Sequence, residues 1–180
     1  MNVLSEKIDG SWTLFLDRDG VINVRLIDDY VKNINEFEFL PGVLDAFEIF
    51  AEKFGKIIIV TNQQGVAKGL MTLDMVHLIH RFMVEQIEKQ KGRVDGIYVC
   101  PQLKTDPDNY RKPSPRMAFM AQSDFPEIDF EKSIMVGDSN SDVEFGKNAG
   151  MFTVLVGDEQ TETVPDNRFD SLISFAENLK

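Results

Sequence analysis

Five short apolar runs recur along this 180-residue chain, and longer stretches with the spacing of amphipathic helices separate them. Such runs predict strands that are buried on both faces, and their alternation with helices is typical of a parallel sheet covered on both sides. The strands are predicted at residues 12–16, 56–60, 96–100, 133–137 and 152–156. We therefore expect an α/β fold built on a doubly wound parallel sheet.

The stretches between and after these strands predict helices at residues 41–54, 72–91, 114–123, 140–149 and 170–179. The second helix has the clearest pattern, because Thr72 can cap its first turn and Gly92 can end it. Its apolar face is predicted to contain Met75, Val76, Ile79, Phe82, Met83 and Ile87. Five phenylalanines are predicted to be core residues: Phe37, Phe39, Phe47, Phe50 and Phe54.

With 43% hydrophobic residues the chain can bury one sizeable core, and we expect residues 1–180 to form a single domain. Two long loops, 21–40 and 101–111, follow the first and third strands. Neither loop is long enough to form a separate cap domain. Long loops in a compact domain tend to carry function, so both are expected to shape a binding site.

The formal net charge of −11 argues against nucleic acid or anionic membrane as a partner, since both are bound by basic surfaces. A small anionic substrate remains possible if a metal ion and a few local cations reverse the field. The one cysteine, Cys100, cannot form an internal disulfide and fits a reducing compartment. The start "MNVLSEKIDG" lacks the features of a secretory signal, and no apolar run approaches the roughly 18 residues of a membrane span. We expect a cytoplasmic monomer.

Polar side chains follow four of the predicted strands. Asp17 and Asp19 follow the first, the segment "TNQQG" follows the second, a loop that reaches Arg111 and Lys112 follows the third, and Asp138 opens "GDSNSD" after the fourth. Ligands of an open parallel sheet bind beyond the carboxyl ends of its strands. We therefore expect these side chains to meet in one site.

Three carboxylates, those of Asp17, Asp19 and Asp138, cannot lie together in ionised form without a cation. Because the ligands are oxygen atoms, with no histidine or cysteine among them, they favour a hard ion such as Mg²⁺. Magnesium also takes phosphate oxygens as ligands, and Lys112 and the hydroxyl of Thr61 could position the remaining oxygens. The set therefore predicts a site for phosphate.

Two carboxylates one residue apart also suggest a reaction. Asp17, held against a metal-bound phosphate, could attack phosphorus and form an aspartyl-phosphate. Asp19 could give a proton to the leaving oxygen and later take one from water. Gly20 would leave the backbone room to turn behind the pair.

The segments "DRDGVIN", "VTNQQG", "RKP" and "GDSNSD" stand in order behind four strands, and they resemble the four motifs of the haloacid-dehalogenase-type phosphatases. More narrowly, "FLDRDGVIN", "FEFLPGV", "VTNQQGVAKG", "DGIYVCP", "RKPSPRM" and "MVGDSNSD" resemble the D-glycero-D-manno-heptose 1,7-bisphosphate phosphatases and the related histidinol-phosphate phosphatases. The resemblance extends over residues 12–156. It implies a doubly wound fold of the haloacid-dehalogenase type and magnesium-dependent hydrolysis of a small phosphorylated metabolite.

The resemblance also assigns roles to residues. It implies that the catalytic residues are Asp17 as nucleophile, Asp19 as acid and base, Thr61 and Lys112. It implies that Mg²⁺ is held by the carboxylate of Asp17, by the backbone carbonyl of Asp19 and by Asp138. The expected substrate-binding residues are Asn62, Gln63, Gln64 and Arg111. The 7-phosphate of a heptose 1,7-bisphosphate is the expected target, and histidinol phosphate is the alternative.

The chain departs from the resemblance in the loop after the third strand. Many members hold a structural zinc there with a Cys-x-His pair and a Cys-x-Cys pair. Here Cys100 is present, but Gln102 replaces the histidine, and Asp108 and Tyr110 replace the two later cysteines. One soft ligand does not make a tetrahedral site, so we expect no structural zinc and expect Cys100 to be a small buried hydrophobe.

Several alternatives stay open on the sequence alone. Asp142 could act in the metal site or only at a helix N-terminus. Lys68 could reach a second phosphate of the substrate or be solvated. His77 and His80 have the spacing of one helix face, and we expect both to be structural.

A phosphoacceptor domain of the receiver type is the alternative from another class. It also combines an aspartate, Mg²⁺, a threonine and a lysine on a doubly wound sheet. A receiver, however, has a separate acidic pair after its first strand and no proton-donating aspartate two residues beyond the acceptor. Asp19 therefore favours hydrolysis over storage of the phosphoryl group.

Overall fold

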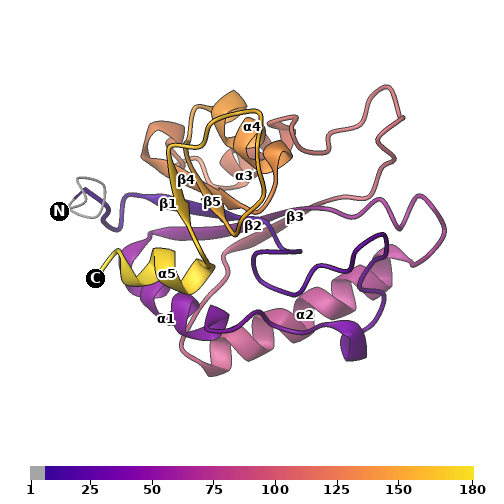
Figure 1. Ribbon diagram of the computed structural model, residues 1–180, viewed down its shortest axis with the longest axis horizontal. Helices are drawn as coiled ribbons and strands as arrows, with labels where there is room; N and C mark the ends of the chain where they lie inside the picture. Colours follow the sequence, from indigo (N-terminus) through magenta and orange to yellow (C-terminus); the bar gives the residue numbers. More distant parts are fainter. Residues whose placement is uncertain (1–6) are drawn as a thin grey trace.

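A parallel sheet of six strands lies at the centre of the computed structural model, which describes residues 7–180 (Figure 1). The strands are β1 (Thr13–Leu16), β2 (Lys56–Asn62), β3 (Gly96–Cys100), β4 (Ser133–Gly137), β5 (Phe152–Val156) and β6 (Asn167–Phe169). Their order across the sheet is β3-β2-β1-β4-β5-β6, and every neighbouring pair is parallel. The chain proceeds outward from β1 in both directions, which confirms the doubly wound parallel sheet.

Helices cover both faces of this sheet (Figure 1). On one face lie α1 (Val43–Lys53), α2 (Leu73–Lys89) and α5 (Leu172–Glu177), and on the other lie α3 (Arg116–Asp124) and α4 (Asn140–Ala149). Two short 3₁₀ helices, η1 (Ile34–Glu36) and η2 (Phe130–Lys132), lie in the connections. Within residues 7–180 no separate cap domain is inserted between these elements.

Successive residues of a strand point to opposite faces, so the central strands contribute to two cores. Leu14 and Leu16 of β1 pack in the core on the side of α1 and α2, whereas Phe15 packs in the core on the side of α3 and α4. All three side chains are fully buried. This two-sided burial explains why β1 is apolar at every position instead of alternating with polar residues.

The predicted elements agree with the structure to within two residues at each boundary, except that β6 and the 3₁₀ helices were not predicted. β6 is a three-residue strand with the sequence Asn-Arg-Phe, and it pairs with β5 at the edge of the sheet. Short, partly exposed edge strands carry no continuous apolar run, so periodicity does not reveal them. The hydroxyl of Thr72 caps α2 as predicted, accepting from the Met75 N–H at 3.2 Å.

Two details differ from the sequence-based expectation. The left-handed residue after α2 is Lys91, with φ of 62°, and not Gly92. The Cβ of any residue replacing Gly92 would lie 2.8 Å from the Cβ of Phe47, so the glycine is needed for close packing. Of the five phenylalanines, four are buried, and Phe39 is half-buried with its ring edge-on to Phe37 at 5.0 Å.

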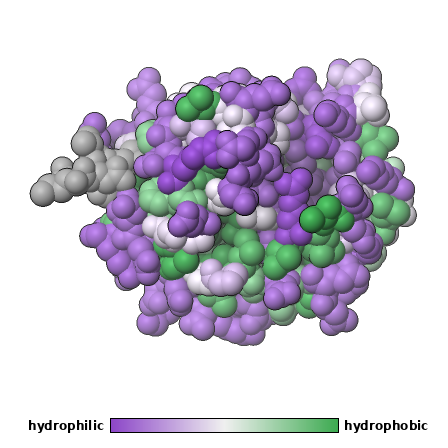
Figure 2. Space-filling view, viewed as in Figure 1, coloured by the Kyte–Doolittle hydropathy of each residue, from purple (hydrophilic) through white to green (hydrophobic). Residues whose placement is uncertain are grey.

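The surface shown in Figure 2 is mostly hydrophilic, and hydrophobic side chains emerge chiefly over the lower half of that view, where α1 and α2 lie. No helix among the described residues is long and apolar enough to cross a membrane. Residues 1–6, part of the segment in which we predicted no secretory signal, lie outside the described residues.

Candidate active site

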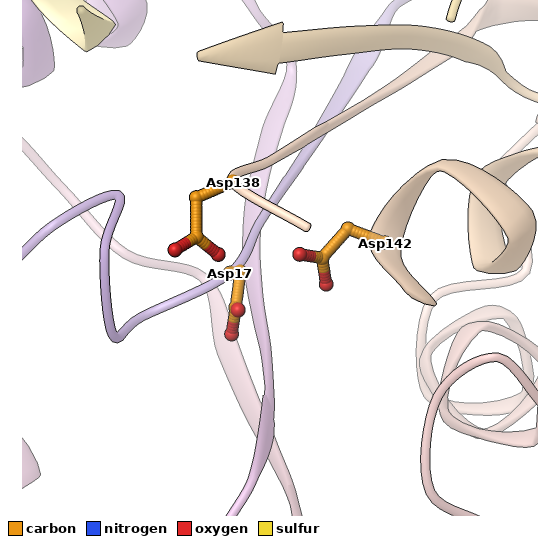
Figure 3. Close-up of side chains that lie close together, drawn as sticks. All are labelled: Asp17, Asp138 and Asp142. Carbon is orange, nitrogen blue, oxygen red and sulfur yellow. The ribbon is translucent and has the colours of Figure 1, made fainter. Parts of the chain in front are cut away.

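Three carboxylates converge at the point where the order of the strands reverses, between β1 and β4 (Figure 3). Asp17 directly follows β1, Asp138 directly follows β4, and Asp142 lies in the first turn of α4. One oxygen atom of each carboxylate lies within 4.8 Å of the others. In doubly wound sheets this switch point is where ligands bind.

The ammonium group of Lys112 joins two of these carboxylates. Its Nζ lies 2.7 Å from Oδ1 of Asp17 and 2.6 Å from Oδ1 of Asp142, and it donates to the backbone carbonyl of Val60 at 3.0 Å. The side chain of Lys112 is only 1% exposed. Asn62 holds the backbone of Lys112 in place, since its Oδ1 accepts from the Lys112 N–H at 3.0 Å.

Burial and mutual repulsion perturb these groups. Burial raises the pKa of Asp17 to about 8, with Lys112 opposing the shift and Asp142 and Asp138 adding to it. Burial, together with the charge of Asp142, also raises the pKa of Asp138 to about 6. Burial acts to lower the pKa of Lys112, but the carboxylates of Asp142 and Asp17 outweigh it and raise that pKa. Oxygen donors that repel one another in this way fit a hard divalent cation such as Mg²⁺.

Two glycines allow the carboxylates to approach so closely. Gly20 has a left-handed φ of 89°, and a Cβ added there would lie 2.0 Å from Oδ2 of Asp138. A Cβ added at Gly137 would lie 2.0 Å from the Cβ of Asp142. A larger residue at either position would push the carboxylates apart. The "DRDG" and "GDSNSD" segments therefore need glycine at these positions in order to pack against each other.

The carboxylate of Asp19 does not belong to this cluster. Its Oδ1 accepts from Arg18 Nη2 at 2.8 Å and from Asn23 Nδ2 at 3.0 Å, and its Oδ2 accepts from Gln63 Nε2 at 2.7 Å. Burial acts to raise the pKa of Asp19, but the charge of Arg18 and these hydrogen bonds outweigh it and lower that pKa. Asp142 therefore takes the place that we had expected for the side chain of Asp19 beside Asp17 and Asp138.

The end of β2 and the residues that follow it lie beside Asp19 and the pocket. Thr61 is fully buried, and its Oγ1 accepts from Gln63 Nε2 at 2.9 Å. Gln63 was expected to bind substrate, but it is also fully buried, and its amide nitrogen is shared between Thr61 and Asp19. The structure therefore corrects that expectation, because Gln63 supports Asp19 and has no exposed atom to offer a ligand. Gln64 lines the pocket.

The carboxylates open into a pocket of about 600 Å³. We call the four buried or nearly buried charged residues the floor: Asp17, Lys112, Asp138 and Asp142. We call four residues that line the pocket above them the wall: Arg25, Gln64, Lys68 and Arg111. The floor carries the chemistry of a phosphate site, and the wall adds cations around it.

The three cations of the wall have different surroundings. Arg25 Nη1 lies 3.3 Å from Oδ2 of Asp138, and its side chain is 55% exposed. Lys68 is exposed and donates to the hydroxyl of Tyr30 at 3.0 Å. Arg111 is half-buried, and its Nη1 is buried without a hydrogen-bond partner among residues 7–180. Arg111 lines the pocket, and a guanidinium group is suited to receive an anionic oxygen from a ligand.

Asp142 contacts both the helix N-terminus and the charged cluster. Its Oδ2 accepts from the N–H and the hydroxyl of Ser139 at 3.1 and 2.6 Å and so caps α4, while its Oδ1 contacts Lys112. His77 is exposed, whereas His80 is buried and contacts Arg18. The sequence did not predict the contacts of Arg18 and Asn23 with Asp19. An arginine between two acidic residues and an asparagine in a loop have the sequence pattern of ordinary surface residues.

The loop 101–111 is held by its own polar groups. Gln102 Oε1 accepts from the backbone N–H of Tyr110 at 3.0 Å, and Asp106 Oδ2 accepts from the N–H of Leu103 at 2.9 Å. Cys100 is buried as expected, and burial raises the pKa of its thiol. The donor set around Cys100 is an amide oxygen at 3.8 Å and not a second thiolate or an imidazole, so these residues do not fit zinc.

Known proteins resemble this chain in sequence. The HAD-hydrolase-like family model matches residues 109–172. A D-glycero-alpha-D-manno-heptose-1,7-bisphosphate 7-phosphatase of Mycobacterium tuberculosis is 38% identical over 97% of this chain and 94% of its own length. The chain belongs to the heptose-1,7-bisphosphate 7-phosphatase family. This membership confirms the predicted phosphoric monoester hydrolase of the haloacid-dehalogenase superfamily.

Other relatives of the family add detail. The D-glycero-beta-D-manno-heptose-1,7-bisphosphate 7-phosphatase of Rhodopseudomonas palustris is 37% identical over 76% of this chain and 78% of its own length. The crystal structure of the D,D-heptose 1,7-bisphosphate phosphatase from B. bronchiseptica, complexed with magnesium and phosphate, superposes with a TM-score of 0.82. It is 29% identical and covers 93% of this chain and 97% of its own. This likeness confirms the predicted fold.

Proposed function

We propose that this chain is a magnesium-dependent phosphatase that removes the 7-phosphate of a D-glycero-D-manno-heptose 1,7-bisphosphate through an aspartyl-phosphate on Asp17. The observation that carries the proposal is the floor of the pocket, where three carboxylates converge at the switch point of the sheet and two of them contact the buried ammonium of Lys112. The family to which the chain belongs supports the choice of substrate.

The floor fits Mg²⁺ by its donor chemistry, because its ligands are carboxylate oxygens that need a cation to share the space. Asp17 and Asp138 would hold the ion, together with the backbone carbonyl of Asp19. When bound, the ion would neutralise phosphate oxygens and polarise the phosphorus. Lys112 already lies against Asp17, so it can stabilise the negative charge that develops on the transferring phosphoryl group.

The residues of this chain would act in two steps. In the first, an oxygen of Asp17 bonds to phosphorus, the bond from phosphorus to the leaving oxygen breaks, and Asp19 gives that oxygen its proton. In the second, Asp19 takes a proton from water as the water oxygen attacks phosphorus and releases Asp17. The pKa of Asp19 is lowered before substrate binds, which suits the second step. A phosphate dianion beside Asp19 opposes its ionisation and so favours proton uptake for the first step.

The wall would recognise the rest of the substrate. Arg111 has a buried nitrogen without a partner among the described residues, and Arg25 and Lys68 add charge around an open mouth. Such a mouth gains affinity from charge and hydrogen bonds more than from apolar contact, which favours a substrate with a second phosphate. Relatives are named for both the alpha and the beta anomer, so the wall is also where anomer preference would be set.

We further propose that residues 1–180 act as one catalytic domain, as a cytoplasmic monomer free of zinc. All four residues of the floor lie in the loops and the helix that follow β1, β3 and β4 of the single sheet, which supports the first part. The substituted zinc ligands of the loop 101–111 support the last.

The test is a side-by-side assay of both anomers of heptose 1,7-bisphosphate, a hexose monophosphate and histidinol phosphate. We expect a heptose 1,7-bisphosphate to give the highest kcat/KM, with phosphate released from C7. A chelator should stop turnover, and added magnesium should restore it. A higher kcat/KM for histidinol phosphate would reject the heptose assignment, and undiminished turnover in chelator would reject the metal.

A further inference from the structure

Arg18 lies between the two carboxylates of the first motif, and its guanidinium has two separate partners. Its Nη2 donates to both oxygens of Asp19, at 2.8 and 3.0 Å. Its Nη1 lies 3.1 Å from Nε2 of His80, a residue of α2 that is 62 positions away in the chain. Arg18 is fully buried, and His80 is only 4% exposed.

The direction of the contact with His80 follows from the chemistry of the two groups. A guanidinium has only donors, so Nη1 must donate and Nε2 of His80 must accept. His80 is therefore neutral, with its proton on Nδ1. Burial, reinforced by the charge of Arg18, lowers the pKa of His80 to about 3, which keeps the ring in this form at neutral pH.

The guanidinium is planar and rigid, so a partner that fixes Nη1 also fixes where Nη2 lies. Nη2 in turn contacts both oxygens of Asp19, which stays 27% exposed on the pocket side. Asn23 and Gln63 also donate to the Asp19 carboxylate, but its ionic contact, with Arg18, depends on a side chain of α2 that does not line the pocket.

Burying an arginine in this way is costly. A buried charge loses several kcal/mol of hydration, and apolar residues of similar volume often fill such a space at no loss of stability. Arg18 Nε also has no hydrogen-bond partner among the described residues. Stability alone therefore gives little reason for an arginine at this position, whereas a requirement on the geometry of Asp19 does.

We infer that His80 is a positioning residue, which orients Arg18 so that Arg18 holds the carboxylate of Asp19 in place for proton transfer to the leaving oxygen. The inference rests on the proposed role of Asp19. In that step the proton moves from Asp19 to the leaving oxygen as its bond to phosphorus breaks. Neither Arg18 nor His80 gains or loses a proton.

The experiment compares two substrates that differ in their need for this proton. The C7 oxygen of a heptose 1,7-bisphosphate leaves as a strongly basic alkoxide unless it is protonated, whereas p-nitrophenolate leaves p-nitrophenyl phosphate readily without a proton. The measured quantity is kcat/KM, because it reports the first step alone, and the second step, in which Asp19 takes a proton from water, is common to both substrates. We expect His80→Leu to lower kcat/KM for the heptose about 10- to 100-fold and to leave kcat/KM for p-nitrophenyl phosphate nearly unchanged. His80→Gln keeps an acceptor for Arg18 and should recover much of the loss.

Two controls separate positioning from a general loss of structure. His77→Leu removes a histidine from the same helix at an exposed position, and it should leave kcat/KM unchanged for both substrates. His80→Leu in an Asp19→Asn background should have little further effect on the heptose, because the two residues would act through one carboxylate. If His80→Leu folds poorly, His80→Asn, whose shorter side chain cannot reach Arg18, takes its place beside His80→Gln.

The possible failures are distinguishable. Equal losses of kcat/KM on both substrates in the His80 variants, with a selective loss in Asp19→Asn, would overturn the positioning role and leave the proposed function intact. Equal losses of kcat/KM on both substrates in Asp19→Asn itself would overturn proton transfer from Asp19 to the leaving oxygen and the inference with it.

Discussion

Arg111 and Lys112 are neighbours in the chain, but one lies in the wall of the pocket and the other in its floor. The Lys112 side chain is 1% exposed and has three oxygen atoms around its ammonium group, whereas Arg111 is half-buried and keeps one nitrogen without a partner among the described residues. The ammonium group of Lys112 thus has all its partners within the protein, whereas Arg111 is partly exposed in the pocket. This difference indicates that the residues of the floor carry out the reaction and that the residues of the wall select the substrate.

The largest effect is expected from the residue that we propose as nucleophile. Asp17→Asn should abolish turnover of every phosphate ester, because an amide cannot attack phosphorus. The far-UV spectrum and the unfolding transition should remain native, since the amide is nearly the same size as the carboxyl group. Substantial activity in the purified variant, measured with a wild-type-free preparation, would contradict the mechanism.

Lys112→Met tests whether the network of the floor is as tightly coupled as its contacts suggest. Removal of the ammonium leaves two buried carboxylates without their cation, which should cost about 3–5 kcal/mol of unfolding free energy without metal. Turnover should fall about 100- to 1,000-fold, as for loss of one group that stabilises a developing charge. Urea unfolding with and without magnesium measures the first effect, and magnesium should recover part of it. Unchanged stability would mean that the contacts of Lys112 contribute little.

The sequence predicts the floor better than its surroundings, and the reason is physical. Asp17 and Asp138 directly follow strands, so the position of a strand end in a parallel sheet is enough to bring them together, and Lys112 comes from the end of the long loop after β3. The contact between Arg18 and His80 joins residues 62 positions apart through side chains alone. No local pattern encodes such a contact, and a histidine on a helix has the same appearance in sequence whether or not it accepts from a buried arginine.

The prediction for Gln63 illustrates the same limit. The segment "TNQQG" correctly indicates a polar strand end, but only the turn of the chain decides which of two adjacent glutamines lines the pocket and which is buried beneath Asp19. Likewise β6 was not predicted, because its three residues gain their strand conformation from pairing with β5 and not from their own apolarity.

Arg111→Ala tests the wall without disturbing the floor. We expect kcat/KM for a heptose 1,7-bisphosphate to fall about 10- to 100-fold, which is the value of a charge-assisted hydrogen bond, while a hexose monophosphate loses less. Stability should hardly change, in contrast to Lys112→Met. Lys68→Ala is the matched control, because it also removes a cation from the pocket wall, but one that already donates a hydrogen bond to Tyr30. Equal losses for bisphosphate and monophosphate would show that Arg111 acts on the scissile phosphate alone.

The pH dependence of magnesium binding should report the ionisation of carboxylates in the floor and not that of groups in the wall. Magnesium binds ionised carboxylates, so it must displace the protons that burial retains on Asp17, with its pKa near 8, and on Asp138, with its pKa near 6. Affinity should therefore rise with pH between these values, by about tenfold per pH unit for each proton released, and level off above 8. Calorimetric titrations in buffers of different ionisation enthalpy count those protons. An affinity independent of pH from 6 to 8 would show that both carboxylates are already ionised.

The smallest effect is expected at the loop 101–111, which forms part of the wall through Arg111 and is held by hydrogen bonds. Gln102 Oε1 accepts from the N–H of Tyr110, so Gln102→Ala should lower the unfolding free energy by about 1 kcal/mol and leave kcat nearly unchanged. Elemental analysis of protein purified without added metal should find well under one zinc per chain, and a zinc chelator should not shift the unfolding midpoint. Stoichiometric zinc would mean that Cys100 and its neighbours form a site despite the missing ligands. The loop would then be stabilised by a metal, and Gln102→Ala should weaken zinc binding together with stability.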